Sequence, residues 1–287
     1  MRRPPLRFAV AFGFGALCAC TAPAPQGTAT QTQAYDPCAA AFFCDDFEND
    51  AANKVPPPPW KEEMYGSGAA ISVDGDHAFS GQQAMHISAP KGAPRRGYIA
   101  IHTPPVFPAA RRKMFGRIMV WLDSAPIPLE GKPDVHWTLL QGEGRSADDR
   151  YNSIYRLGAE RQGGLGLKAN FETTPPVRTD CRKHSARKLP VAKWTCVEWH
   201  FDGDKNEMEY WLDGQPLDDI HVSERTDSPD SNCAHQEDLH GVWLAPPAFQ
   251  SLYLGLERYD ATQNDQNLWI DDVVVSASRV GCPVSRR

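Results

Sequence analysis

Aromatic rings alternate with Arg, His and Glu side chains in several short segments of the chain. Arg117 and Trp121 share one side of an alternating segment, Glu198 and His200 share one side of another, and Tyr253 stands on one side of a third. Sugars stack their C–H faces on aromatic rings, and their hydroxyl groups need hydrogen-bonding partners. These segments therefore indicate a carbohydrate-binding face, although the same residue types are also ordinary on the solvated side of a sheet.

The segments that carry these residues are predicted strands. Most of the chain after the first forty residues alternates with period two, and clusters of Gly, Pro, Asn or Asp interrupt it at short intervals, the pattern of an all-β sandwich or jelly roll. The predicted strands are Phe42–Phe47, Ala84–Ser88, Phe115–Leu122, Val135–Gln141, Gly164–Ala169, Thr195–Asp202, Glu207–Leu212, Ser251–Arg258 and Leu268–Ser276. Two Pro-containing segments, Ser124–Pro133 and Thr173–Pro190, are predicted as long loops that overhang a cleft.

Alternation also assigns each strand a core side and an outer side. The outer sides hold the candidate sugar-binding residues, together with His136. The sides predicted to face the core are Ile118, Val120 and Leu122; Val135, Trp137 and Leu139; Val197, Trp199 and Phe201; and Leu252, Leu254 and Leu256.

The N-terminus has the pattern of a lipoprotein signal peptide. Arg2, Arg3 and Arg7 precede an apolar run to Ala19 that is too short to span a bilayer, and the run ends at a lipobox-like sequence before Cys20. We expect residues 1–19 to be the signal peptide, Cys20 to be the lipidated residue, 20–37 to be a flexible tether and 38–287 to be a single domain. The alternative is an ordinary cleaved signal.

These features predict an exported protein in the cell envelope, either an outer-membrane lipoprotein or a secreted one, with the lipid anchor as its only membrane contact. Thr21 rather than Asp follows Cys20, which favours the outer membrane by resemblance to the usual sorting pattern. We expect a monomer.

Six cysteines lie beyond the signal segment: Cys38, Cys44, Cys181, Cys196, Cys233 and Cys282. In an exported domain this number suggests three disulfides. If the first and last strands lie side by side and antiparallel, Cys38 or Cys44 pairs with Cys282. No two cysteines have C-x-x-C spacing and the histidines do not cluster around them, so a zinc site is not expected.

The mature chain is predicted to be acidic. Removing the three signal arginines from 30 Lys+Arg leaves 27 against 36 Asp+Glu, a formal charge of −9. Nucleic acid is therefore not expected as a partner, because phosphate binding needs a basic face. An acidic polymer would require a local basic cleft.

Several motifs occur in an order that resembles a known family. They are FCDDFE (43–48), SGQQAMHI (80–87), HWTLLQGEG (136–144), YRLGA (155–159), WTCVEWHFDG (194–203), YWLDG (210–214) and LWIDDVVVS (268–276). Together they resemble bacterial relatives of the fungal cellulose-induced secreted protein, whose jelly roll is similar to that of the glucuronan lyases. The resemblance spans Cys38 to Cys282 and implies a concanavalin-like two-sheet jelly roll that binds or cleaves polysaccharide.

Such jelly rolls commonly hold a structural calcium ion between the first strand, the loop after it and the last strand. Ca²⁺ takes six to eight oxygen ligands. The matching donors are Glu48, Asp74 or Asp76, and Asp271. The alternative for Asp74 and Asp76 is a plain turn beside glycine.

If the resemblance extends to activity, the chain cleaves a uronic-acid polymer by β-elimination. Arg117 is the candidate partner of the uronate carboxylate, His136 the base, and Tyr155 or Tyr253 the acid. Gln141 and Arg156 are the alternates for neutralising the carboxylate. Trp121, Glu198 and His200 complete the candidate substrate contacts.

Two other readings remain at this point. A non-catalytic carbohydrate-binding module needs only an aromatic platform, Trp121 with Tyr253 or Trp211, and a structural envelope lipoprotein needs no sugar ligand at all. A retaining glucanase is not expected, because its E-x-D-x-x-E strand is absent; Glu198 and Asp202 share a face but lack the third carboxylate.

Overall fold

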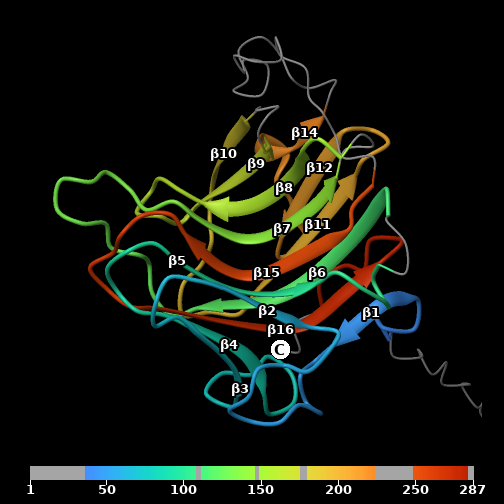
Figure 1. Ribbon diagram of the computed structural model, residues 1–287, viewed down its shortest axis with the longest axis horizontal. Helices are drawn as coiled ribbons and strands as arrows, with labels where there is room; N and C mark the ends of the chain where they lie inside the picture. The colour runs from blue at the N-terminus through green and yellow to red at the C-terminus, as the bar shows by residue number, and fades with distance from the viewer. Residues whose placement is uncertain (1–35, 108–110, 146–148, 175–179, 224–247, 284–287) are drawn as a thin grey trace, which may run out of the picture. The chain divides into compact units, whose positions relative to one another are not determined.

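The computed structural model describes residues 36–107, 111–145, 149–174, 180–223 and 248–283 (Figure 1). The predicted signal peptide, Cys20 and nearly all of the tether lie outside these residues. Asp36–Arg287 is one compact unit. Within the described residues, no helix has the length and apolar character needed to cross a membrane.

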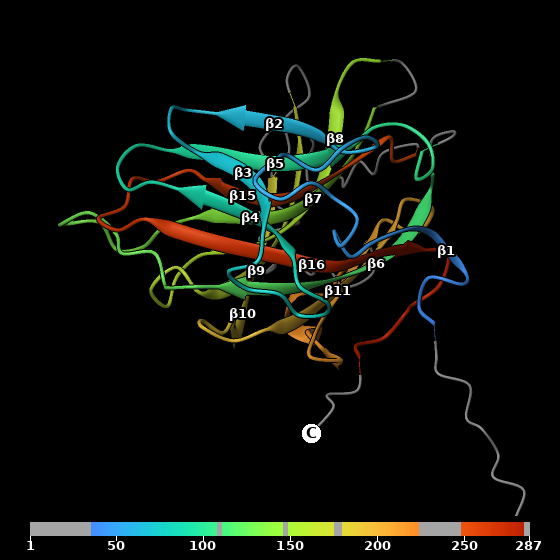
Figure 2. The same ribbon diagram turned by 90° about the horizontal axis from the view of Figure 1, so that it is seen from below.

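The described strands form two antiparallel sheets. In sheet A the order is β13-β12-β11-β6-β16-β4-β3, with β1 beside β16 and β14 beside β12. Its strands are β1 (Ala41–Asp45), β3 (Ala70–Asp74), β4 (Ala84–Ala89), β6 (Lys113–Leu122), β11 (Thr195–Asp202), β12 (Glu207–Leu212), β13 (Gln215–Pro216), β14 (Val222–Ser223) and β16 (Gln266–Ser276). Figure 2 shows the long β16 between β4 and β6.

Sheet B has the order β10-β9-β8-β7-β15-β5-β2. Its strands are β2 (Lys61–Tyr65), β5 (Arg95–Ile101), β7 (Trp137–Arg145), β8 (Asn152–Ala159), β9 (Gly166–Thr173), β10 (Asp180–Lys188) and β15 (Ser251–Arg258). A short 3-10 turn, η1 (Asp218–Ile220), is the one helical element among the described residues. This is the expected all-β jelly roll.

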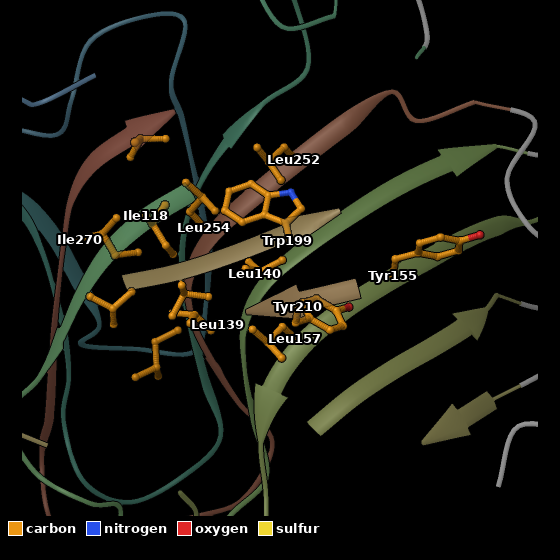
Figure 3. Close-up of a cluster of buried hydrophobic side chains, with 14 of the residues drawn as sticks. Ile118, Leu139, Leu140, Tyr155, Leu157, Trp199, Tyr210, Leu252, Leu254 and Ile270 are labelled. Carbon is orange, nitrogen blue, oxygen red and sulfur yellow. The ribbon is translucent and has the colours of Figure 1, made fainter. Parts of the chain in front are cut away.

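The core lies between the sheets, because alternation places an apolar side chain at every second position of each strand. Trp199 and Ile270 of sheet A meet Leu140 and Leu254 of sheet B there (Figure 3). All the core positions predicted above are buried in this cluster. A Cβ at Gly116 would lie 1.9 Å from Cζ2 of Trp199, so the indole needs glycine at that position.

All nine predicted strands are present, and β11, β12 and β15 have the predicted bounds. The loop predicted at Ser124–Pro133 is a loop with one bridge to Thr262. The second predicted loop, Thr173–Pro190, is wrong over much of its length, because β10 fills 180–188 and pairs with β9. The sequence does not reveal this strand, because its two sides are both polar: Arg182 and His184 lie on one side and Lys183 on the other.

The predicted disulfide between Cys38 or Cys44 and Cys282 is also wrong. Cys44 pairs with Cys38, and Cys282 pairs with Cys196 of β11. The first and last strands do lie side by side, with Cys44 opposite Val274. However, the chain after β16 crosses the outer side of sheet A, so Cys282 reaches β11 instead of β1. Cys181 is also disulfide-bonded.

Candidate functional site

The outward face of sheet B carries one continuous row of side chains across its strands, all of them polar except Ala100. The register aligns Arg182, Asn170, Arg156, Gln141, Tyr253, Ala100 and Lys61, from β10 to β2. We call this line the central row. Alternate residues of the same strands fill the core, and the irregular register of β7 between Thr138 and Leu140 places Gln141 in the row.

Arg156 is the hub of the central row. Its Nε donates to Oε1 of Gln141 at 2.7 Å, and its Nη1 donates to Oδ1 of Asn170 at 3.2 Å and to Glu172. Burial alone would lower the pKa of Arg156, but Tyr259 and the Glu172 carboxylate raise this pKa overall. The arrangement is a planar, fixed donor of the kind that binds a carboxylate with two hydrogen bonds.

A pocket of about 310 Å³ lies beside the central row and is lined by a phenol, a carboxyl group and an imidazole, which can transfer protons. A second pocket, of about 330 Å³, lies on sheet A. Tyr253, Glu143 and His102 line the pocket beside the central row together with Gly144, Arg145, Asn152, Gln250 and Ser251. The Tyr253 hydroxyl donates to Oε2 of Glu143 at 3.4 Å, and the rings of His102 and Tyr253 meet edge to face with centroids 5.3 Å apart.

Burial shapes the protonation of these groups. It raises the pKa of Tyr253 to about 12, with the Glu143 carboxylate adding to the effect, and it raises the pKa of Glu143. It lowers the pKa of His102, so the imidazole is neutral at physiological pH. Nε2 of His102 is buried without a hydrogen-bond partner, 3.6 Å from Oε1 of Glu63. A neutral phenol and a neutral imidazole therefore share one pocket.

His136 lies on the same face, but its lone pair is occupied. Nε2 of His136 contacts Nζ of Lys168, which also donates to Oε2 of Glu160 at 3.1 Å; Glu160 in turn binds His184. Burial and the neighbouring ammonium group of Lys168 lower the pKa of His136. His136 thus reads as part of a buried Lys–His–Glu cluster, with Lys168 only 1% exposed.

The cations of this face are matched by carboxylates. Arg96 pairs with Glu257, Arg156 with Glu172, Lys168 with Glu160, Arg182 with Asp180, and Lys61 with Glu63. The face is therefore rich in hydrogen-bonding groups but balanced in charge, and the basic cleft that an acidic polymer would favour is not evident among the described residues.

The structure does not bring Arg117 and His136 together, because β6 belongs to sheet A and β7 to sheet B. Arg117 is 3% exposed on the outer side of sheet A, with Nη2 3.4 Å from the carbonyl oxygen of Asp272. It lines the sheet A pocket beside the Cys38–Cys44 disulfide. The predicted pairing of these two residues in one site is corrected accordingly.

The other sheet A candidates also lie away from the central row. Glu198, predicted as a substrate contact, accepts hydrogen bonds from Arg279 and from the Gly281 backbone, so it fastens the C-terminal segment. The Trp121 ring stacks on His77 at 4.4 Å. His200 stacks on Phe115 at 4.0 Å.

Tyr155 is a core residue. Its ring is fully buried and is drawn with the core side chains in Figure 3. It packs edge to face on Phe171, Phe201 and Phe249. A substrate on the outward face cannot reach this hydroxyl. The prediction of Tyr155 as the acid is therefore wrong. Adjacent residues of β8 point to opposite sides, so the outward Arg156 leaves Tyr155 in the core.

The predicted calcium donors lie around one loop. Glu48 Oε1 accepts the backbone N–H groups of Gln82 and Gln83, and Asp271 Oδ2 accepts those of Phe79 and Ser80. First strand, loop and last strand thus meet as the resemblance implies.

Further oxygen atoms gather at the same place. The carbonyl oxygens of Phe47, Glu48 and Asp50 each lie 3.4 Å from Nε2 of Gln83, and Oδ2 of Asp50 is buried without a partner. These hard oxygen donors fit Ca²⁺.

The two loop candidates differ from each other. Asp74 accepts a hydrogen bond from Nε1 of Trp269 and bonds Nδ1 of His86. Its Oδ1 also accepts a hydrogen bond from the backbone N–H of Asp76, which is the plain turn given above as the alternative to a calcium site. Asp76 itself is exposed.

Sequence reasoning missed His102, Glu143 and Lys168. The alternation that could have identified them is visible in the sequence: Tyr98, Ala100 and His102 alternate with the aliphatic Ile99 and Ile101. Likewise, Lys168 and Asn170 alternate with Leu167, Ala169 and Phe171 in β9. A polar side opposite an aliphatic side predicts an outward face, although not which sheet it belongs to.

Comparisons with known proteins agree with this architecture. A family profile described as "Polysacc_lyase-like: Cip1-like, core domain" matches residues 46–278. No curated protein matches the sequence significantly.

Two solved structures share the fold. "Cellulose induced protein, Cip1" superposes with a TM-score of 0.58 at 18% identity, covering 84% of this chain and 100% of that one. The endo-beta-1,4-glucuronan lyase from the fungus Trichoderma reesei superposes with a TM-score of 0.51 at 12% identity, covering 83% and 96%.

Proposed function

The chain belongs to the polysaccharide-lyase-like family with the Cip1-like core domain, and we propose that it binds a polysaccharide across the outward face of sheet B and cleaves a uronic-acid polymer there. The observation that carries the proposal is the adjacency of Arg156, Gln141 and Tyr253 in the central row, beside the pocket that holds His102. The likeness to a glucuronan lyase supports the choice of polymer.

The reaction is a β-elimination at the uronate ring. Arg156 and the Gln141 amide hold the uronate carboxylate, which makes the hydrogen on the neighbouring C5 acidic. The His102 imidazole takes that proton; the C5–H electrons form the C4–C5 double bond, the C4–O4 bond breaks, and the Tyr253 hydroxyl protonates O4. Elimination yields an unsaturated sugar at the new non-reducing end.

His136 is less suited to the role of base than His102. Its Nε2 faces the Lys168 ammonium group, whereas His102 has a neutral imidazole that lines the pocket beside Tyr253, and its Nε2 has no hydrogen-bond partner. We assign His136 to the far end of the binding face, where Lys168 and Glu160 hold its ring in place.

A non-catalytic carbohydrate-binding module is the second candidate. It is favoured by the charge balance of the face, since a uronate would have to displace Glu172 from Arg156. A neutral polysaccharide would need only the hydrogen-bonding groups that the central row offers.

We further propose an exported protein with a lipid anchor on Cys20 and a structural calcium ion bound near Glu48, Asp76 and Asp271. The disulfides support an oxidising compartment, where such bonds persist. The gathered oxygen donors support the ion.

Incubation of the protein with glucuronan, alginate and neutral glucans separates the two candidate functions. The lyase proposal expects ultraviolet absorbance from unsaturated ends to rise with a uronic-acid polymer, and the rise to be lost in Arg156→Lys. Retention of a polymer on the protein without any rise would favour the binding module. The absence of both cleavage and retention with every polymer would contradict both functions.

A further inference from the structure

The outer side of sheet A holds a histidine and glutamate cluster that the proposed polysaccharide reaction does not use. His200 of β11 lies directly opposite Glu209 of β12, and their side chains meet at 2.6 Å between Nδ1 and Oε2. Glu207 precedes Glu209 by two residues and lies on the same side of β12. One ligand atom from each of His200, Glu207 and Glu209 lies within 4.8 Å of the others, close enough to bind one ion.

A second histidine adjoins the cluster. His221 precedes β14, which pairs with β12, and its Nε2 lies 3.0 Å from Oε1 of Glu207. Three ligand residues therefore already lie together, and His221 meets them through Glu207 from a third neighbouring strand segment. The antiparallel register fixes them, so binding would need little rearrangement of the backbone.

His200 is the best-placed member of this group. It is only 3% exposed, and Phe115 stacks on its ring at 4.0 Å, which fixes the orientation of the imidazole. Its Nε2 is buried without a hydrogen-bond partner, 3.8 Å from Oδ2 of Asp202. With Nδ1 on a metal, Nε2 would carry the proton and face Asp202, the carboxylate–histidine–metal arrangement that is common around zinc.

We propose that His200, Glu207, Glu209 and His221 bind a zinc-class divalent cation on the outer side of sheet A. Imidazole nitrogen and carboxylate oxygen are ordinary zinc ligands, and four protein ligands suit a closed, structural site. Calcium is disfavoured, because it prefers oxygen ligands alone. The ion would fasten β11, β12 and the segment before β14 to one another.

Two lysines lie near the cluster. Nζ of Lys205 is 3.7 Å from Oε2 of Glu207 and Nζ of Lys113 is 3.5 Å from Oδ2 of Asp202, although both side chains are exposed and can swing into solvent. Cysteine spacing gives no signal for this site, because none of the four proposed ligands is a cysteine. The histidines and glutamates are far enough apart in the sequence that only the register of β11, β12 and β14 brings them together.

The test measures zinc binding by the full mature protein without a histidine tag. The protein is stripped with a chelator, returned to calcium-containing buffer so that calcium does not vary, and titrated with zinc chloride by calorimetry. We expect one equivalent to bind, and Co²⁺ in its place to give the visible absorption of a tetrahedral site. Glu207→Gln/Glu209→Gln should weaken binding more than about tenfold, and Asp202→Asn about 10–100-fold through the orientation of His200.

Asp74→Asn is the matched control, since Asp74 and His86 form a similar histidine–carboxylate pair on sheet A. It should leave zinc binding unchanged. Near-ultraviolet circular dichroism of each zinc-free variant verifies that the variant is folded. The proposal is overturned if the wild-type protein takes up less than one equivalent, or if the folded Glu207→Gln/Glu209→Gln variant binds zinc as tightly as the wild type.

Discussion

Arg156 donates a 2.7 Å hydrogen bond from Nε to Oε1 of Gln141, across the β7–β8 pair on the outward face of sheet B. This bond orients both side chains before any substrate arrives. Gln141 is in turn the register partner of Tyr253, which lines the pocket together with His102. The pair is therefore the natural place for a uronate carboxylate.

Arg156→Lys should keep the positive charge but lose the planar pair of donors. If Arg156 neutralises the carboxylate in the transition state, kcat on a uronic-acid polymer should fall by about 100- to 1000-fold. Initial rates from the absorbance of unsaturated ends provide the measurement. Arg112→Lys is the control, because Arg112 is half exposed and pairs with Asp204 away from the central row. Equal rates for the Arg156 variant and the wild type would remove Arg156 from the reaction.

Tyr253→Phe removes only the hydroxyl group that is proposed to protonate the leaving oxygen. The loss of a positioned general acid should lower kcat by about 100- to 10000-fold. Because the pKa of Tyr253 is raised to about 12, the wild-type acid stays protonated to strongly alkaline pH. A rate profile against pH in wild type and variant, with melting temperature as the folding control, checks this role. A variant that retains full activity would show that the acid is another group.

His102→Gln is the companion test for the base. Gln keeps the polar character of the position but cannot accept a proton near neutral pH. We expect the rate to fall as it does in Tyr253→Phe while the retention of polymer on the protein is preserved. Loss of polymer retention without a specific loss of rate would instead make His102 a binding residue.

The strand pattern predicts the fold well because it depends on local alternation. Ile118 and Trp199 face the core as predicted, because an apolar residue at every second position identifies the buried side of a strand without knowledge of its neighbours. The same pattern cannot say which sheet a strand joins. Arg117 and His136 are both outward residues of good strands, yet β6 and β7 belong to different sheets, and sheet membership is decided by pairing between distant segments.

Parts of the site were missed for related reasons. The YRLGA motif of β8 was identified from the sequence without assigning which of its residues point outward. Tyr155 and Arg156 were therefore both candidate site residues, although adjacent residues of a strand point to opposite sides. The structure settles this pair: Tyr155 is in the core and Arg156 is outward. Tyr253 was identified correctly as outward, whereas Gln141 was named without a face. The irregular register of β7 between Thr138 and Leu140 breaks the simple alternation, and the pairing with β15 makes Gln141 and Tyr253 neighbours.

The stability of the protein should rise with pH below 6.5, partly because of His136. Its folded pKa is lowered by burial and by Lys168, so the unfolded chain binds a proton that the folded chain does not. The free energy of unfolding therefore increases as pH rises towards 6.5, by at most about 1.4 kcal/mol per pH unit for one proton.

His136→Gln keeps an acceptor for Lys168 and removes this titration. Urea unfolding between pH 4.5 and 6.5 should show a smaller slope against pH in the variant. His102 and His200 also have lowered pKa values, so part of the slope should remain. An unchanged slope would mean that His136 titrates normally in the folded protein.

The two assigned disulfides should differ in their contribution to stability. Cys196 and Cys282 are separated by 86 residues, whereas Cys38 and Cys44 are separated by 6. Since a cross-link restricts the unfolded chain more when it closes a longer loop, Cys196→Ala/Cys282→Ala should lower the free energy of unfolding by about 2–5 kcal/mol. Cys38→Ala/Cys44→Ala should cost less. Denaturant unfolding of both double variants provides the comparison, and the reverse order would contradict it.

Calcium should raise the melting temperature of the protein, because an ion that binds only the folded state stabilises it by about 2.7 kcal/mol at a concentration 100 times its Kd. The ligand carboxylates must be ionised to bind, and burial raises the pKa of Asp271 to about 7. The calcium-dependent rise should therefore be larger at pH 8 than at pH 5.5. Glu48→Gln should abolish the rise, Asp76→Asn should reduce it, and Asp204→Asn, an exposed carboxylate elsewhere, should leave it intact. Thermal scans in chelator and in added Ca²⁺ measure each case, and an equal rise in wild type and Glu48→Gln would place the ion away from this loop.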